Sequence, residues 1–256
     1  MTSNSPYQAP GAEVVNPPDS DSPVLNSTPN VCTAGQSWDW IKQGFNLFKS
    51  DPGTWIGMLI VYMIIMVVLG IIPFLGSLAT MILGPVFTGG FMIACAKMET
   101  KEAGVGDLFA GFQDKFGPLA ILGLIYLGLL MVPLLGMFAL GLGGAMLGGD
   151  PGAIENPANF QFMLLGLLVF IAVMIPIAMG MWFSPALIIF HDCSPWQAYK
   201  LSFMGCLKNI VPFLVYGIIL LPLVFLAVLP VGLGLLIFGP TVLASIYQSY
   251  KMIFLE

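Results

Sequence analysis

Residues 54–96 read TWIGMLIVYMIIMVVLGIIPFLGSLATMILGPVFTGGFMIACA, an apolar stretch without any Asp, Glu, Lys, Arg or His. A helix needs about 20 residues to cross the hydrocarbon layer of a bilayer, so this stretch is long enough for two crossings. Pro73 and Gly76 mark a tight turn near its middle. The stretch therefore predicts a membrane-spanning helical hairpin with spans at Thr54–Ile72 and Ser77–Ala96.

The same pattern continues along the rest of the chain. Four more charge-free apolar segments follow, at Pro118–Leu147, Phe160–Phe190, Val211–Leu229 and Gly232–Tyr250. The first two of these are longer than one straight crossing needs, and Pro133 and Pro176 predict kinks or tilts in them. We expect an all-α, polytopic membrane protein with about six transmembrane helices.

The composition agrees with lipid as the main solvent. Only 8% of the 256 residues are charged, 58% are hydrophobic, and the mean hydropathy is +0.94. A soluble domain normally has about 25% charged residues to cover its surface. A water-soluble fold is therefore excluded.

The basic residues predict the orientation in the membrane. All eight are Lys, and with six spans all of them lie on the same side of the membrane; they are Lys42, Lys49, Lys97, Lys101, Lys115, Lys200, Lys208 and Lys251. Because cytoplasmic loops carry the excess of basic residues, we expect both termini in the cytoplasm. Residues 1–36 hold no Lys or Arg and are rich in Ser, Pro and Asn, which predicts a disordered polar tail before a transmembrane domain at 37–256.

An internal repeat is also predicted. Aromatic and apolar residues spaced 3, 4, 3 precede the first, third and fifth spans, and this spacing predicts one face of an amphipathic helix; they are Trp38, Ile41, Phe45, Phe48; Phe109, Phe112, Phe116, Leu119; and Trp196, Tyr199, Phe203, Cys206. The second span of each pair contains a small residue and a proline, at Gly84-Pro85, Ser184-Pro185 and Gly239-Pro240. We interpret the chain as three units, at about 37–98, 105–192 and 194–256. The aromatic faces either lie in the lipid headgroup region or pack on the spans of the protein itself.

Few residues offer chemistry, and we expect no catalytic, cofactor-binding or metal-binding residues. The single His, His191, is followed by Asp192, and we interpret the pair as a helix end that meets water. Glu99, Glu102, Asp107 and Asp114 lie among lysines and predict a solvated mixed-charge face, with Asp107 as a helix N-cap. The cysteines have no C-x-x-C spacing and predict free thiols; they are Cys32, Cys95, Cys193 and Cys206.

Other function classes find little support. The run Gly141–Gly149 lacks the Lys-Ser/Thr ending of a phosphate loop, and its Gly144 and Gly148 suit close helix packing. Eight dispersed lysines without Arg form no nucleic-acid patch. Coupled transport normally uses an ionisable residue inside the membrane, and the predicted spans hold none. A passive path for an apolar or amphiphilic solute stays open.

Two sets of residues resemble known families. The first set resembles an uncharacterised family of proteobacterial inner-membrane proteins; it comprises Trp40, Gly44, Phe48, Pro52, Gly53, Trp55, Ile56, Gly57, Leu83-Gly84-Pro85 and 107–112. The second resembles the membrane domain attached to some glycerophosphodiester phosphodiesterases; it comprises 184–187, 194–198 and Ser202. The resemblance implies a six-span helical fold and no established activity.

We therefore expect a non-enzymatic inner-membrane protein that organises or partners membrane lipids, other membrane proteins or copies of itself, and binds no nucleic acid. The alternative is a transporter or permease-like protein for an apolar or amphiphilic solute. A weaker alternative is a lipid-active enzyme that uses His191 and Asp192.

Overall fold

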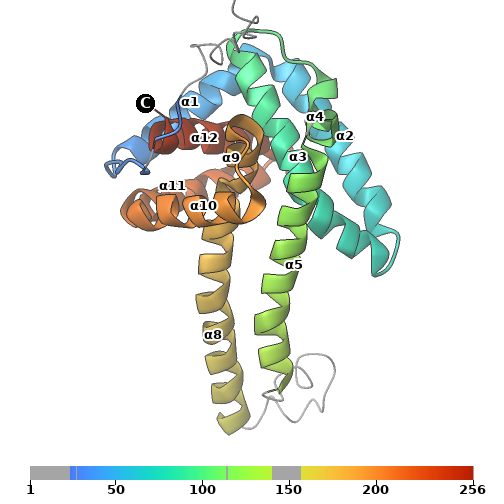
Figure 1. The fold of residues 1–256 in the computed structure, drawn as a ribbon, viewed down its shortest axis with the longest axis vertical. Coiled ribbons are helices and arrows are strands. Elements are labelled where there is room, and N and C mark those ends of the chain that lie inside the picture. The colour runs from blue at the N-terminus through green and yellow to red at the C-terminus, as the bar shows by residue number, and fades with distance from the viewer. Residues whose placement is uncertain (1–23, 27, 114, 140–156, 256) are drawn as a thin grey trace, which may run out of the picture.

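The computed structural model describes residues 24–26, 28–113, 115–139 and 157–255, which are helical except for loops and one isolated bridge (Figure 1). Helices that match the predicted spans are α2 (Pro52–Gly70), α3 (Leu75–Glu99), α5 (Phe116–Ala139), α8 (Pro157–Trp182) with α9 (Ser184–His191), α11 (Ile210–Val228) and α12 (Leu235–Phe254). Shorter helices are α1 (Gln36–Ser50), the 3-10 helix η1 (Val105–Phe109), α4 (Ala110–Gln113) and α10 (Pro195–Lys208). The predicted all-α fold is confirmed.

Five segments of the described chain are long and apolar enough to cross a membrane: α2, α3, most of α5, the residues 164–191 of α8 and α9, and α11. The last predicted span, α12, is not among them, because its second half carries Ser245, Gln248, Ser249 and Lys251. Large apolar side chains of these helices also face outward; Val67 of α2 is 64% exposed and Leu221 of α11 is 68% exposed. Such outward faces are expected where lipid is the solvent.

The predicted span at 160–190 is two helices, because the chain breaks at Phe183 between α8 and α9. Pro185 lies in the first turn of α9, where its missing N–H removes no helix hydrogen bond. The Ser202 hydroxyl of α10 spans the break: it accepts a hydrogen bond from the Phe183 N–H (2.9 Å) and donates one to the Met179 carbonyl (2.7 Å). Pro133 and Pro176 lie inside continuous helices.

The first and third segments predicted as amphipathic helices are helical, as α1 and α10. The second is not one helix, because the chain there divides into η1, α4 and the start of α5. On α1, Ile41 and Phe48 of the predicted stripe are buried, whereas Trp38 and Phe45 are exposed. Trp40, Gly44 and Leu47, which lie outside the stripe, are buried as well. The buried face of α1 therefore overlaps the predicted stripe in part and is rotated from it.

These short segments dock through small residues beside the prolines of other helices. A Cβ atom on Gly44 of α1 would lie 2.6 Å from both the Thr241 carbonyl oxygen and the Ser245 amide nitrogen of α12, next to Pro240. A Cβ atom on Gly111 of α4 would meet the carbonyl of Val86 in α3, the residue after Pro85.

Ser202 of α10 makes the third such contact, at the α8–α9 break beside Pro185. The contacts follow a cyclic order. The helix α4 packs on α3, which precedes it, and α10 packs on α8 and α9, which precede it, whereas α1 packs on α12, the last described helix. This arrangement encloses the fully buried Trp40, Trp55, Phe183, Tyr250 and Phe254. Whether the three units are a sequence repeat stays a prediction.

The two ends of the described chain lie together. Leu25 forms an isolated antiparallel bridge with Leu255, and the Asn26 N–H donates to the Phe254 carbonyl at 2.8 Å. Farther along, the Cys32 N–H donates to the Asn209 side chain at 2.7 Å. The packed part of the chain therefore begins before residue 37, where the predicted tail was expected to end; residues 1–23 and 27 lie outside the described residues. Ends that pair directly require an even number of membrane crossings between them.

The helices do not form a set of parallel rods. In Figure 1, α5 and α8 run lengthwise beside each other, while α10 and α12 run across the view near their upper ends. The hairpin of α2 and α3 slopes away on the other side. This arrangement places the ends of α3, α9 and α12 near one another, and their polar side chains meet there.

Candidate functional site

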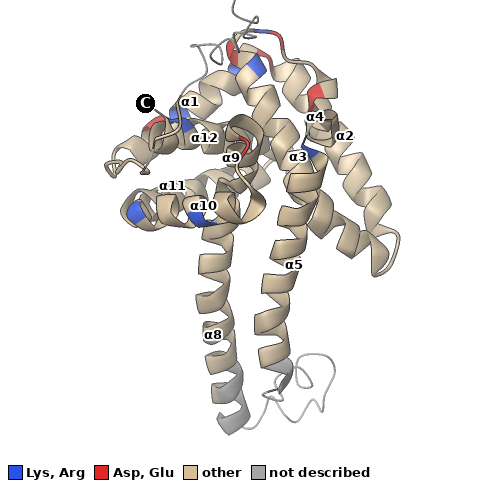
Figure 2. Cartoon of the chain, viewed as in Figure 1, with Lys and Arg blue, Asp and Glu red and all other residues tan. Residues whose placement is uncertain are grey.

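Charged residues of the described part of the chain gather at one end of the molecule. Figure 2 shows them around the upper helices, while the long lower parts of α5 and α8 and the turn between α2 and α3 carry none that is described. Three ion pairs join different elements at this end: Lys97 with Asp107 (2.5 Å), Lys251 with Glu99 (2.8 Å), and Lys115 with Asp192. Two carboxylates of the predicted mixed-charge face, Glu99 and Asp107, are thus paired with lysines.

Glu99, at the end of α3, accepts hydrogen bonds from three side chains of α12. Its carboxylate accepts from the Lys251 ammonium at 2.8 and 2.9 Å, from the Gln248 amide at 3.1 Å and from the Tyr247 hydroxyl at 3.4 Å. These residues come from one helical face, because they are three and four positions apart. The cluster fixes the end of α3 to the end of α12.

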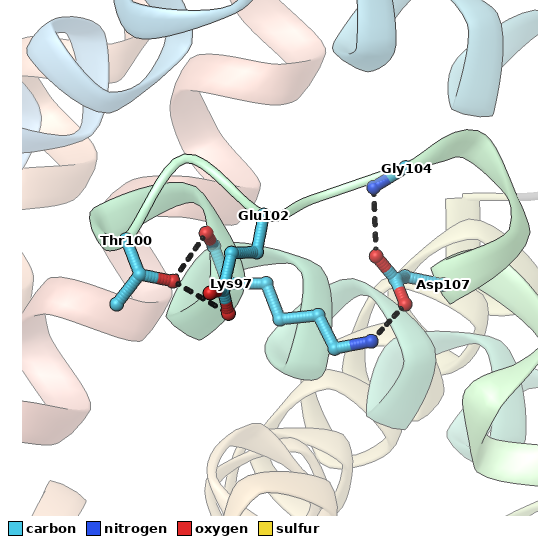
Figure 3. A network of polar contacts seen from close by, with 5 residues as sticks. All are labelled: Lys97, Thr100, Glu102, Gly104 and Asp107. Atoms are coloured by element: carbon cyan, nitrogen blue, oxygen red, sulfur yellow. Dashed lines mark hydrogen bonds and ion pairs between the residues drawn. The ribbon is translucent and has the colours of Figure 1, made fainter.

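Asp107 has a capping role, but not the one predicted. Gly104, rather than Asp107, is the N-cap of η1. The carboxylate of Asp107, three residues after Gly104, accepts a hydrogen bond of 2.8 Å from the Gly104 N–H (Figure 3). The same carboxylate pairs with Lys97 of α3, and Glu102 accepts from the Thr100 hydroxyl at 3.3 Å. These contacts close the loop between α3 and η1. Asp114 lies outside the described residues.

The side chains of His191 and Asp192 bind different partners. The Nε2 atom of His191 lies 2.5 Å from the Tyr250 hydroxyl, whereas the Asp192 carboxylate pairs with Lys115 of the neighbouring α5 segment. Asp192 has a left-handed backbone (φ 52°) and ends α9. Each side chain thus joins its helix end to a different element, in line with the interpretation of the pair as a helix terminus.

No group of three His, Cys, Asp or Glu residues in the described part of the chain is placed to hold a metal ion. All four cysteines are free and buried, as the spacing predicted. The run Gly141–Gly149 lies outside the described residues.

Three of the cavities between the described helices have mostly apolar linings. The first, about 350 Å³, lies between α8, α10 and α11 and includes Met179, Trp182 and Phe213. The second, about 510 Å³, is bordered by α3, α5, α8, α9 and α12 and includes Thr80, Thr88 and Tyr126.

The third cavity, about 450 Å³, lies between α1, α11 and α12. Ligand sites in proteins commonly have volumes of about 300–1,000 Å³ and mostly apolar walls. The three cavities therefore suit apolar or amphiphilic molecules better than ions or sugars.

The sequence pattern missed most of these partners. Tyr247 and Gln248 fall inside the predicted last span and Lys251 among the predicted cytoplasmic lysines, although the polar run 245–251 at the end of an apolar helix is a usable signal of a buried polar cluster. Tyr250 as the partner of His191 could not be foreseen, because it lies 59 positions away in the chain.

The sequence is 31% identical over 234 residues to a probable inner membrane protein of Burkholderia thailandensis, an alignment that covers 86% of this chain and 83% of the relative. No family model matches the sequence, and no solved structure matches it. The similarity to this relative and the long apolar helices both support an inner-membrane location.

Proposed function

The chain belongs to the same family as the probable inner membrane protein of Burkholderia thailandensis, and from this we propose a non-enzymatic protein that organises lipids or partner proteins in that membrane. The observation that carries the proposal is the distribution of polar groups. The described spans contain no charged side chain in their interiors, and three ion pairs join charged residues at one end of the molecule. The interiors of these described spans thus offer no carboxylate, Lys or His for coupled transport or for acid–base chemistry.

We place both termini in the cytoplasm. The bridge between Leu25 and Leu255 supports a common side for the two ends, and the lysines of the predicted loops favour the cytoplasmic side. The partners in this proposal are membrane lipids, other membrane proteins or further copies of the chain.

The test is to purify the protein in a mild detergent and to identify by mass spectrometry what remains bound. An unrelated six-span protein from the same membranes serves as the control. Lipid or protein retained above that control supports the proposal. Retention equal to the control contradicts it.

A transporter for an apolar or amphiphilic solute is the second candidate, and the 510 Å³ cavity favours it. This cavity is bordered by five helices, and Thr88 and Tyr126 add a few polar groups to apolar walls. Gly84 lines it and has open space where a Cβ would lie. Saturable flux into liposomes that is abolished by Gly84→Leu, with no retained partner, would favour this candidate over the first.

A lipid-active enzyme using His191 and Asp192 is the weakest candidate, because the two side chains bind different partners. If the protein were such an enzyme, His191→Ala would abolish turnover of a lipid substrate. The non-enzymatic function proposed here expects no turnover by the wild-type protein or by His191→Ala.

A further inference from the structure

The cavity between α1, α11 and α12 differs from the other two in having a cation on its wall. Lys42 of α1 lines it, together with apolar residues of α11 and α12 that include Leu226, Ala227 and Ile237. The first cavity has no charged residue in its lining, and the polar groups of the second are neutral. We call this third cavity the α1 groove.

Lys42 is exposed and takes part in none of the ion pairs that join the described residues, in which Lys97, Lys115 and Lys251 are engaged. Trp38 lies one helical turn before it and Phe45 one turn after it, and both also line the α1 groove. These two aromatic side chains are 53% and 41% exposed. An exposed Lys between aromatic residues is the pattern of a helix at the boundary between headgroups and acyl chains.

The neighbours of α1 put it at one face of the membrane. Its first residues follow the segment that pairs with the chain terminus, and its last residue, Ser50, is followed at once by Asp51 and the span α2. Both ends of α1 thus lie where spans begin or end. Lys42, between them, is at headgroup depth, where a long side chain can direct its ammonium toward phosphates.

The geometry points to an anionic phospholipid as the occupant of the α1 groove, with one acyl chain against α11 and α12 and its phosphate beside Lys42. This inference rests on the proposed function and names a lipid class and a site for it. Charge complementarity selects the anionic headgroup, since a basic side chain beside a lipid-facing pocket attracts such lipids. The apolar walls select the acyl chain, because burying each CH₂ group is favourable by about 0.8 kcal/mol.

The experiment titrates the detergent-purified, full-length protein with phosphatidylglycerol and with phosphatidylcholine of the same acyl chains, and native mass spectrometry measures the bound fraction. We expect tighter binding of phosphatidylglycerol, and a loss of about fivefold in its affinity in Lys42→Gln. Phosphatidylcholine binding should be the same in both proteins. Glycerol 3-phosphate, which has no acyl chain, should not compete.

Two matched controls separate the α1 groove from the general charge of the surface. Lys49 lies on the same face of α1, two turns later, and does not line the groove, so Lys49→Gln should retain the affinity. Leu226→Trp should fill the groove and weaken binding, whereas Leu221→Trp, on the exposed surface of the same helix, should not.

Several results would overturn the inference: equal affinities for the two lipids, equal losses in Lys42→Gln and Lys49→Gln, or unchanged binding in Leu226→Trp. Those results would leave the proposed function intact if lipid still co-purified with the protein. Retention of no lipid and no partner by the wild-type protein would instead contradict the proposed function itself.

Discussion

Burial decides the chemistry of the individual polar residues in this chain. Cys206 of α10 lies against α8, where its thiol donates to the Met179 carbonyl at 3.5 Å. Removal from water disfavours the charged thiolate, and burial raises the pKa of Cys206 to about 12. Burial also raises the pKa values of Cys32 and Cys193.

The native cysteines should therefore be unreactive in the folded protein, because the thiolate is the form that attacks electrophiles. We expect no maleimide labelling at neutral pH in mild detergent and labelling of all four after denaturation in SDS, as measured by intact mass. Labelling of any native cysteine before denaturation would contradict the buried position of that side chain. The prediction also makes the natural protein a usable background for introduced cysteines.

Asp51 shows the opposite effect, since hydrogen bonds from Thr54 lower the pKa of its carboxyl group. The carboxylate caps α2 by accepting the Thr54 N–H at 3.1 Å. Asp51→Ala should reduce the stability by about 1 kcal/mol, and Asp51→Asn by less, because Asn also caps helices.

The contribution of the Asp51 charge has a defined pH dependence. A lowered folded-state pKa gives stability that is complete above the ordinary value of 3.8 and is lost as the pH falls through the lower folded value. The difference in Tm between wild type and Asp51→Asn should thus shrink from neutral pH to about pH 3. A difference that grows on acidification would contradict this role.

At the scale of helices, hydropathy predicts the spans well and predicts their packing poorly. The ends of α2, α3 and α11 lie within a few residues of the predicted bounds, because long apolar runs leave few alternatives. The break at Phe183 and the division of the segment at 105–119 were missed, since both depend on contacts with other helices. The face of α1 was misjudged because Gly44, which has no side chain, forms the centre of its contact with α12.

That contact makes Gly44 sensitive to substitution. In Gly44→Ala the new Cβ would meet two backbone atoms of α12 at 2.6 Å, and backbone cannot move aside as a flexible side chain can. We expect a loss of about 1–3 kcal/mol in stability, seen as a lower Tm in detergent. Gly128→Ala, in α5 with open space at its Cβ, should be neutral or stabilising because Ala favours helices. Equal effects of the two changes would argue against the docking of α1 on α12.

At the scale of the whole molecule, the sequence predicted the all-α fold and its long apolar helices, but not how the helices pack across one another. The number of six crossings stays a prediction, because five described segments are apolar enough to cross and α12 is not one of them. The polar residues of α12 are accommodated by Glu99 and by α1, which a hydropathy pattern does not register. The candidate site was missed for the same reason, because its walls come from segments distant in the chain.

The crossing of α11 and α12 can be tested with a cysteine in the turn between them. Gly234, next to this turn, lines the α1 groove together with Lys42, so the turn lies close to α1. Leu233→Cys, at an exposed position, should therefore react with a membrane-impermeant maleimide from the cytoplasmic side, as should Glu102→Cys, whereas Ala153→Cys in the connection between α5 and α8 should react from the periplasmic side. Labelling of Leu233→Cys from the periplasm alone would show that α11 and α12 cross the membrane, and it would contradict the placement of Lys42 at the cytoplasmic headgroups.

The contact of α1 with α12 also bears on the order of events at the ribosome. Among the described helices, α1 is synthesised first and α12, on which it packs, is synthesised last. Until α12 has been made it cannot cover Trp40 and Leu47, so a chain cut before α12 exposes an apolar surface that the described fold conceals. Synthesis of α12 is thereby the step that covers this face of α1.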